Sequence, residues 1–271
     1  MQLTPNVFVE TRFHGANVGY ITTDDGVVMV ETPFRPTDAV TWRKEIEGKG
    51  PLRYLINTEP HDDHFVGGFF FATTAVAHEK AREAMLAADI NRIKQTIAII
   101  DPAGLSLIDN YRVNVPAITF SERLTLYLGR HSFHLMHLPG HTAGQIAVFL
   151  PEERVVFTGD NVTYRVQGFL HEADPFAWLE SLKRIDELDV DYLVPGHGEV
   201  CNKNYIKEQA DYIQGCVDAV RKAIDRGWTR DEAIARVALP SPYPLDEDSK
   251  SVAVQLLKVS VSNLYYRLCH R

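Results

Sequence analysis

Short apolar runs rich in β-branched residues recur along the first 200 residues, and polar or glycine-containing segments separate them. The runs 18–22 and 27–30 flank an Asp-Asp-Gly segment at 24–26, and an Asp-Gly pair in such a place predicts a β-hairpin. A helix-like pattern over 36–46 leads to the next predicted strand, 53–56. Further strands are predicted at 123–128, 132–138, 145–150, 154–157 and 192–194.

Helical periodicity dominates after residue 200. The stretch 206–226 is amphipathic, Thr229-Arg230-Asp231-Glu232 has the pattern of a capping box that begins another helix, and a last helix is predicted at 249–266. We therefore expect one catalytic domain over residues 1–200, with residues 201–271 as a helical C-terminal extension packed on the same domain.

The segment between these two patterns is harder to interpret. Residues 78–88 have helical spacing, but the pattern weakens from 89 to 116, and Asp-Pro-Ala-Gly at 101–104 breaks it. A segment of this length without a clear period is typical of an insertion, and insertions of this kind often lie over a functional site.

Candidate metal ligands cluster directly after the predicted strand 53–56. Residues 59–64 read Glu-Pro-His-Asp-Asp-His, and Phe-Val-Gly-Gly follows. Imidazole and carboxylate groups are common ligands of divalent metal ions. Three more candidates follow predicted strands, each beside a glycine: His141, Asp160 and His197. Because a rigid sheet can hold loop residues in fixed geometry while a coordination position stays open to substrate, the sequence predicts a metalloenzyme.

Composition narrows the possible partners. The chain has 271 residues, of which 45% are hydrophobic, enough for one large core with a helical appendage. Its net charge of -8 argues against nucleic acid or an anionic membrane as partner, so we expect a small-molecule substrate. No long apolar segment opens the sequence, and we expect a cytoplasmic protein. The three cysteines are far apart and lack CxxC spacing, which favours neither disulfides nor a thiolate metal site: Cys201, Cys216 and Cys269.

Other conspicuous side chains are interpreted as structural. Three isolated histidines are expected to be ordinary surface or core residues: His14, His78 and His270. Residues His131, His134 and His137 fall on one predicted strand, where residues three apart point to opposite faces, so we do not expect them to share a metal ion. The aromatic triplet 69–71 is interpreted as core packing.

In order and spacing, the motifs resemble those of the metallo-β-lactamase superfamily over roughly residues 15–200. The resemblance implies an α/β fold, a four-layer αββα sandwich with the metal site at the edge of the two sheets. It implies two divalent metal ions, most naturally zinc. One ion would be held by Glu59, His61 and His141 and the other by Asp63, His64 and His197, with Asp160 bridging both.

Glu59 departs from the family pattern, whose HxHxDH motif begins with histidine. Three carboxylates now face two divalent ions, which leaves a formal charge of +1 where the usual motif leaves +2. A bound water is then expected to be less acidic, because its hydroxide form gains less electrostatic stabilisation. The carboxylate also shifts preference toward iron or manganese without excluding zinc. The alternatives are that Glu59 leaves a single metal at the second site, or that it only tunes the charge from outside the ligand set.

The resemblance further implies a hydrolase that uses a metal-bound hydroxide on an ester, lactone, thioester or β-lactam-type bond of a small organic substrate. Asp63 and Asp160 are the expected catalytic residues, with Asp63 orienting the nucleophile and passing a proton to the leaving group. Tyr164 and His171, in the loop after Asp160, are expected substrate contacts. Two alternatives remain open: a non-haem iron enzyme that handles oxygen, and a non-catalytic binding protein that retains the metal site.

Overall fold

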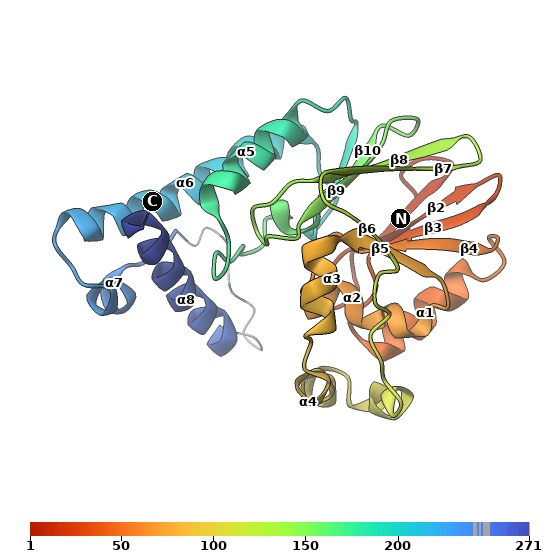
Figure 1. Ribbon diagram of the computed structural model, residues 1–271, viewed down its shortest axis with the longest axis horizontal. Coiled ribbons are helices and arrows are strands. Elements are labelled where there is room, and N and C mark those ends of the chain that lie inside the picture. The colour runs from red at the N-terminus through yellow and green to blue at the C-terminus, as the bar shows by residue number, and fades with distance from the viewer. Residues whose placement is uncertain (241–242, 244, 246–249, 271) are drawn as a thin grey trace.

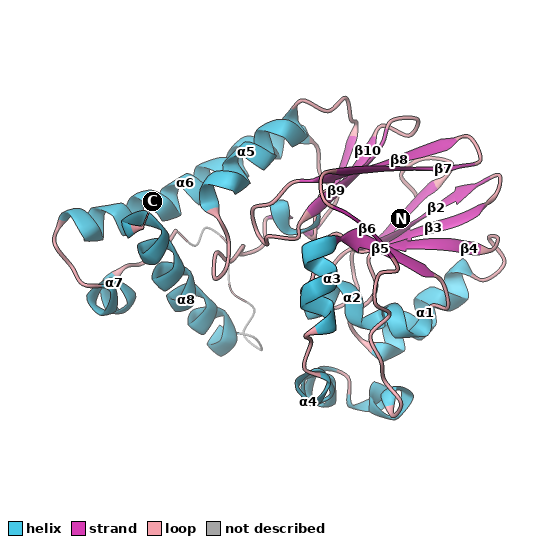
Figure 2. Ribbon diagram, in the orientation of Figure 1, coloured by secondary structure: helices cyan, strands magenta, loops and turns pink. Residues whose placement is uncertain are grey.

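Two β-sheets pack face to face, and helices cover the outer face of each sheet (Figure 1). This computed structural model describes residues 1–240, 243, 245 and 250–270. Figure 2 shows the helices on both sides of the paired sheets, so the predicted four-layer αββα arrangement is confirmed. Among the described residues, no helix combines the length and apolar character needed to cross a bilayer.

The first sheet has six strands in the order β1-β2-β3-β4-β5-β6. Its members are β1 Val7–Glu10, β2 Val18–Thr23, β3 Gly26–Val30, β4 Leu52–Ile56, β5 Thr74–His78 and β6 Ile118–Phe120. The predicted hairpin joins β2 to β3, with Thr23 paired to Gly26. From β3 onward the strands are parallel. Strands β5 and β6 were not predicted, because each is a short run inside a segment without clear turn signals.

The second sheet has five strands in the order β12-β10-β9-β8-β7, and all five lie within one or two residues of the predicted positions. They are β7 Arg123–Leu128, β8 His131–His137, β9 Ile146–Leu150, β10 Val155–Phe157 and β12 Tyr192–Val194. A small parallel pair, β11 Thr163–Tyr164 and β13 His197–Gly198, lies beside them.

Alternation along the strands builds the core between the sheets. On β3, Val28 and Val30 face the second sheet and pack with residues such as Phe133 and Val148. Its other positions, including Met29, pack outward against helix α1 (Pro36–Ile46). Because β3 is covered on both faces, its sequence is a nearly continuous apolar run.

Helix α5 and the C-terminal helices share one apolar cluster with the outer face of the second sheet. They are α5 Pro175–Asp186, α6 Ile206–Asp225, α7 Arg230–Arg236 and α8 Lys250–Cys269. One cluster of buried side chains joins sheet, α5, α6 and α8, through residues such as Val156, Trp178, Val217 and Leu264. The predicted capping box at the start of α7 is present. Position 249, the predicted start of the last helix, lies outside the described residues.

The region interpreted as an insertion contains helix α4 (Ile90–Ile100), which the sequence pattern did not predict. Asp89 caps it by accepting hydrogen bonds from two backbone N–H groups. Ile93 and Ile97 are buried, whereas Ile99 is exposed, and this mixture obscures the period. The neighbouring helical segments are α2 Asp62–Phe65, η1 Val66–Phe70, α3 Glu79–Leu86 and η2 Pro102–Ile108, and two single turns follow later, η3 Gly159–Asn161 and η4 Lys203–Tyr205.

Candidate metal centre

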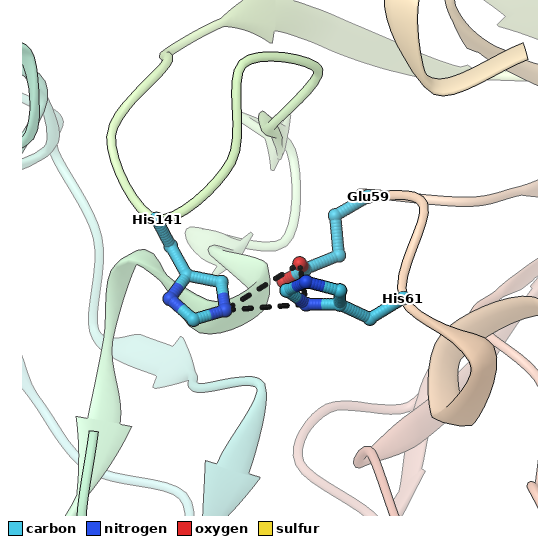
Figure 3. A group of neighbouring side chains, drawn as sticks. All are labelled: Glu59, His61 and His141. Carbon is cyan, nitrogen blue, oxygen red and sulfur yellow. Dashed lines mark hydrogen bonds and ion pairs between the residues drawn. The ribbon is translucent and has the colours of Figure 1, made fainter. Parts of the chain in front are cut away.

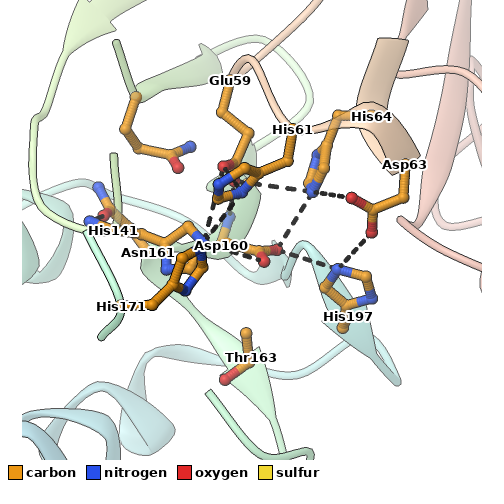
Figure 4. A network of polar contacts seen from close by, with 12 residues as sticks. Glu59, His61, Asp63, His64, His141, Asp160, Asn161, Thr163, His171 and His197 are labelled. Carbon is orange, nitrogen blue, oxygen red and sulfur yellow. Dashed lines mark hydrogen bonds and ion pairs between the residues drawn. The ribbon is translucent and has the colours of Figure 1, made fainter. Parts of the chain in front are cut away.

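All seven predicted metal ligands meet at one edge of the paired sheets (Figure 4). Each comes from a segment that follows a strand. The chain leaves β4 at Ile56 and reaches Glu59, and His61 directly precedes the short helix α2 that carries Asp63 and His64. The other three follow β8, β10 and β12: His141, Asp160 and His197.

The first donor group consists of Glu59, His61 and His141 (Figure 3). His61 Nδ1 lies 2.8 Å from Glu59 Oε2, and His141 Nε2 lies 3.2 Å from His61 Nδ1 and 3.7 Å from Glu59 Oε2. Ligand atoms about 2.1 Å from a tetrahedral ion stand roughly 3.4 Å apart. The spacing therefore suits one metal ion.

The second donor group consists of Asp63, His64 and His197. His197 Nε2 lies 3.2 Å from Asp63 Oδ2, and His64 Nε2 lies 4.0 Å from Asp63 Oδ1. The two imidazole rings meet edge to face, with centroids 5.6 Å apart. This group also has the size of a single-ion site.

Asp160 lies between the two groups and faces both. Its Oδ1 is 3.6 Å from His64 Nε2 and 3.4 Å from His197 Nε2, while its Oδ2 is 3.6 Å from His141 Nε2. Its backbone N–H donates to Glu59 Oε1 at 3.1 Å, which ties the bridging residue to the first group. Asp160 is therefore placed as a bridging ligand would be.

Buried polar atoms without hydrogen-bond partners show that the donor set suits divalent cations. Glu59 and His64 are fully buried, and His64 Nε2 and Asp160 Oδ1 have no hydrogen-bond partner. An unsatisfied buried carboxylate oxygen is costly, and a cation at the centre would satisfy it. Imidazole and carboxylate oxygen together favour zinc, iron or manganese.

Without a metal, protons on the histidines balance the carboxylates. Burial alone would raise the pKa of Asp63 and Asp160, yet neighbouring histidines hold the pKa of both carboxyls well below the usual range. Burial would lower the pKa of His64, but Glu59 and Asp63 raise it to about 10. A metal ion must therefore displace protons when it binds.

Glu31 supports the second group, although no motif or spacing in the sequence pointed to it. It follows β3 at a positive φ of 62° and is almost fully buried. Its Oε1 accepts a 2.7 Å hydrogen bond from the backbone N–H of Thr58 and lies 3.4 Å from His64 Nδ1. Glu31 thus orients the His64 ring from behind. A single acidic residue after a strand carries no spacing signal that could have revealed it.

Of the two predicted substrate contacts, the structure brings His171 to the site and not Tyr164. The His171 ring stacks on His61 with centroids 5.4 Å apart (Figure 4). Tyr164 instead packs edge to face on Tyr205 and lines a separate cavity with Cys201. On β11, Thr163 lines the cleft that leads to the donor groups, whereas Tyr164 does not.

An open cleft of about 550 Å³ leads to the donor groups, a volume suited to a small organic molecule. Apolar side chains form part of its wall: Val166, Phe169, Val252 and Leu256. Arg92 of α4 lies at the rim and pairs with Asp62 at 2.9 Å. The insertion therefore contributes to the border of the cleft.

The other predicted non-ligands have structural partners. On β8, His131 contacts Glu153 and His134 contacts Ser132, while His137 stacks on His78. Among the residues that the structure describes, these histidines form no metal-binding group. The aromatic triplet 69–71 packs in the apolar clusters around α1 and α4, as predicted.

Fold and site together define a metallohydrolase-like αββα protein with two donor groups at the sheet edge. The family model described as "Metallo-beta-lactamase superfamily" matches residues 11–197, and the chain belongs to this superfamily. Superfamily relatives bind divalent metals and include hydrolases.

Individual relatives are distant. The chain is 26% identical over 220 residues to "Metallo-beta-lactamase type 2" of Elizabethkingia meningoseptica, covering 78% of this chain and 79% of that protein. It is 29% identical to "2,4-dinitroanisole O-demethylase subunit alpha" of Nocardioides sp. (strain JS1661), covering 74% of this chain but only 60% of that protein. The solved sec-alkylsulfatase Pisa1 from Pseudomonas sp. aligns at a TM-score of 0.72 and 15% identity, covering 98% of this chain and 49% of that one. That likeness in fold extends through the C-terminal helices.

Proposed function

We propose that this protein is a binuclear metal-dependent hydrolase that cleaves an ester, lactone, thioester or β-lactam-type bond in a small organic substrate. The observation that carries the proposal is the position of Asp160, whose two carboxylate oxygens face different donor groups at the floor of an open cleft. The relatives named for β-lactam and hydroxyacylglutathione hydrolysis support a hydrolytic reaction. Zinc is the expected metal at both groups.

Each residue at the floor of the cleft has its own role in the proposed reaction. Divalent ions held there would acidify a water and polarise the substrate oxygen that gains charge. Asp63 lines the cleft and is partly exposed, so its carboxylate can orient the attacking water and carry a proton toward the leaving group. The hydrogen bond from the Asp160 backbone N–H to Glu59 fixes the position of Asp160 relative to the first group. His171 at the cleft wall can contact the bound substrate.

A second candidate is an oxygen-handling iron enzyme on the same fold. The observation that favours it is the buried carboxylate Glu59. Besides its place in the first donor group with His61 and His141, it lies close enough to His64 and Asp160 to share a metal ion with them. A centre with three carboxylates suits iron better than one built mainly from imidazole. The metal that the protein retains separates the two candidates.

The test combines metal analysis with a substrate panel. The protein is expressed without added metal, purified without a chelating column, and assayed on esters, lactones, thioesters and a β-lactam. The proposal expects hydrolysis of at least one substrate, its loss on chelation and its return with zinc. Exposed Asp191, which pairs with Arg154 on the surface, offers a control variant, Asp191→Asn, that should keep full activity. Retained iron with oxygen consumption and no hydrolysis would favour the second candidate, and failure to bind any metal would contradict both.

A further inference from the structure

His61 has a carboxylate at each ring nitrogen. Its Nδ1 faces the first donor group, 2.8 Å from Glu59 Oε2, and its Nε2 contacts Glu172 Oε1. If Nδ1 binds a metal ion, the ring proton must reside on Nε2, where Glu172 accepts it. Glu172 is thus placed to fix both the tautomer and the orientation of His61. No spacing in the sequence pointed to Glu172, which lies 111 residues from His61.

Helix α8 holds the backbone of the loop that carries Glu172. Asn263 Nδ2 donates hydrogen bonds of 2.8 Å to the carbonyl oxygens of Leu170 and Ala173, on either side of His171 and Glu172. Ser260 Oγ accepts a 2.9 Å hydrogen bond from the Leu170 N–H. The loop is therefore bound to the helix on both sides of the residue that contacts His61.

Arg267 completes this contact. Its guanidinium donates to the backbone oxygen of Glu172 at 3.2 Å and to Asp174 Oδ2 at 3.1 Å. Ser260, Asn263 and Arg267 follow one another at intervals of three and four residues, so they lie on one face of α8. Three polar side chains on one helix face thus fix a five-residue loop beside the first donor group.

We propose that Glu172 is a positioning residue for His61, and that α8 acts on the first donor group by holding Glu172 in place. This inference rests on the proposed metal centre. The second donor group receives its support elsewhere, because Glu31 at the end of β3 lies against His64. Loss of Glu172 should therefore weaken one metal site and spare the other. The C-terminal region gains a role in metal binding as well as in packing.

The experiment measures cobalt binding to the metal-free full-length protein, by competition with a chromogenic chelator and by the absorption of bound Co²⁺. Glu172→Ala should weaken one of two Co²⁺ equivalents by about 10- to 100-fold and change its spectrum. Glu172→Gln keeps a hydrogen-bond acceptor and should recover most of the loss. Glu180→Ala, which removes an exposed carboxylate on α5 that pairs with Lys183, is the matched control and should match the wild type.

The contribution of α8 is tested by Asn263→Ala alone and combined with Glu172→Ala. Asn263→Ala should weaken the same equivalent by a smaller factor, and should add nothing once Glu172 is gone, because both act through one contact. Independent, additive losses would overturn the role of α8.

Two results would overturn the role of Glu172. Unchanged binding of both equivalents in Glu172→Ala would show that His61 needs no positioning, and complete loss in both Ala and Gln variants would make Glu172 a ligand. Wild-type protein that binds two ions but hydrolyses nothing would remove the proposed function and leave this inference intact. Wild-type protein that binds no Co²⁺ would remove both.

Discussion

The two donor groups differ in composition and in support. The second group, Asp63, His64 and His197, matches the family motif at every position, and Glu31 at the end of a buried strand orients its central histidine. The first group carries Glu59 where the family has histidine, and its His61 is contacted from the loop 170–174. The altered motif residue, Glu59, and the contact from the loop that helix α8 holds thus both belong to the first donor group.

This difference has an electrostatic meaning. Glu59 is fully buried and accepts a hydrogen bond from the backbone of Asp160, so its charge is fixed close to both groups. A buried carboxylate beside a divalent ion offsets part of the ionic charge that would otherwise acidify water. If each group binds an ion as proposed, the second position would be conventional and the first would be less electrophilic. Variants can separate the two.

The largest effect is expected from Asp160→Ala, because this residue faces both groups. The variant should lose metal from both positions, and hydrolysis should fall on the order of a thousandfold or more, since metal chemistry supplies several kcal/mol and about 1.4 kcal/mol is tenfold in rate. Elemental analysis and kcat/KM provide the readouts. Loss of only one equivalent would show that Asp160 serves a single group.

Glu59→His restores the family motif and should reduce the difference between the groups. We expect higher zinc occupancy at the first group and a downward shift of the alkaline-activating limb of the pH–rate profile, on the order of one pH unit. Glu59→Gln is the matched control, since it removes the charge but keeps an acceptor for the Asp160 N–H. If zinc content and the limb are the same in Glu59→His and wild type, Glu59 is not a ligand.

Proton release on metal binding should also distinguish the groups. In the second group the pKa of His64 is raised to about 10 and that of His197 is also raised, by the facing carboxylates. In the first group the pKa of His61 is raised, but burial lowers the pKa of His141. Metal binding must neutralise protonated imidazoles, so the second group should release more protons near neutral pH.

Calorimetry in buffers of different ionisation enthalpy measures this release, with His61→Ala used to isolate the second group, because it leaves Glu59 beside His64, and His197→Ala used to isolate the first. The raised pKa of His64 means that the protonated side chain also stabilises the folded, metal-free protein. This contribution is present in full below the unfolded-state pKa of about 6.5, and it is lost as the pH rises toward 10. Zinc affinity at the second group should therefore increase with pH over this window. Equal proton release from both variants would contradict the asymmetry.

The smallest effect is expected from Asp62→Asn, a change inside the same motif. Asp62 lies at the rim, pairs with Arg92 at 2.9 Å and belongs to neither donor group. An ion pair this close to solvent contributes about 0–1 kcal/mol, so metal content should not change and hydrolysis should change by only a few-fold. If this variant lost a metal equivalent, a different set of residues in the motif would bind the metal.

The sequence predicted which seven side chains lie together, because dispersed motifs constrain one another. Each of Glu59, His141, Asp160 and His197 follows a strand, and a sheet brings such positions to a common edge. The strands of the second sheet were predicted closely since they alternate between clear turns. Strands β5 and β6 and helix α4 were missed, because their apolar positions are few or partly exposed.

The supporting residues could not be predicted, for a different physical reason. Glu31 and Glu172 reach the site through the fold, from segments 33 and 111 residues away from the histidines that they contact. A single carboxylate has no period and no spacing, so only tertiary structure assigns it a partner. Tyr164 shows the reverse case, because closeness in sequence to Asp160 did not place its side chain in the cleft.

If the two adjacent donor groups each hold one metal ion, the protein contains two metal equivalents per chain, and a measurement of metal content decides this. Elemental analysis of wild type, Glu59→Ala and His197→Ala should give two equivalents, one and one, with the second-group ion kept in Glu59→Ala and the first-group ion kept in His197→Ala. A single equivalent in the wild type that survives Glu59→Ala and disappears in His197→Ala would contradict the account, because Glu59 would then have left only the second group able to bind metal.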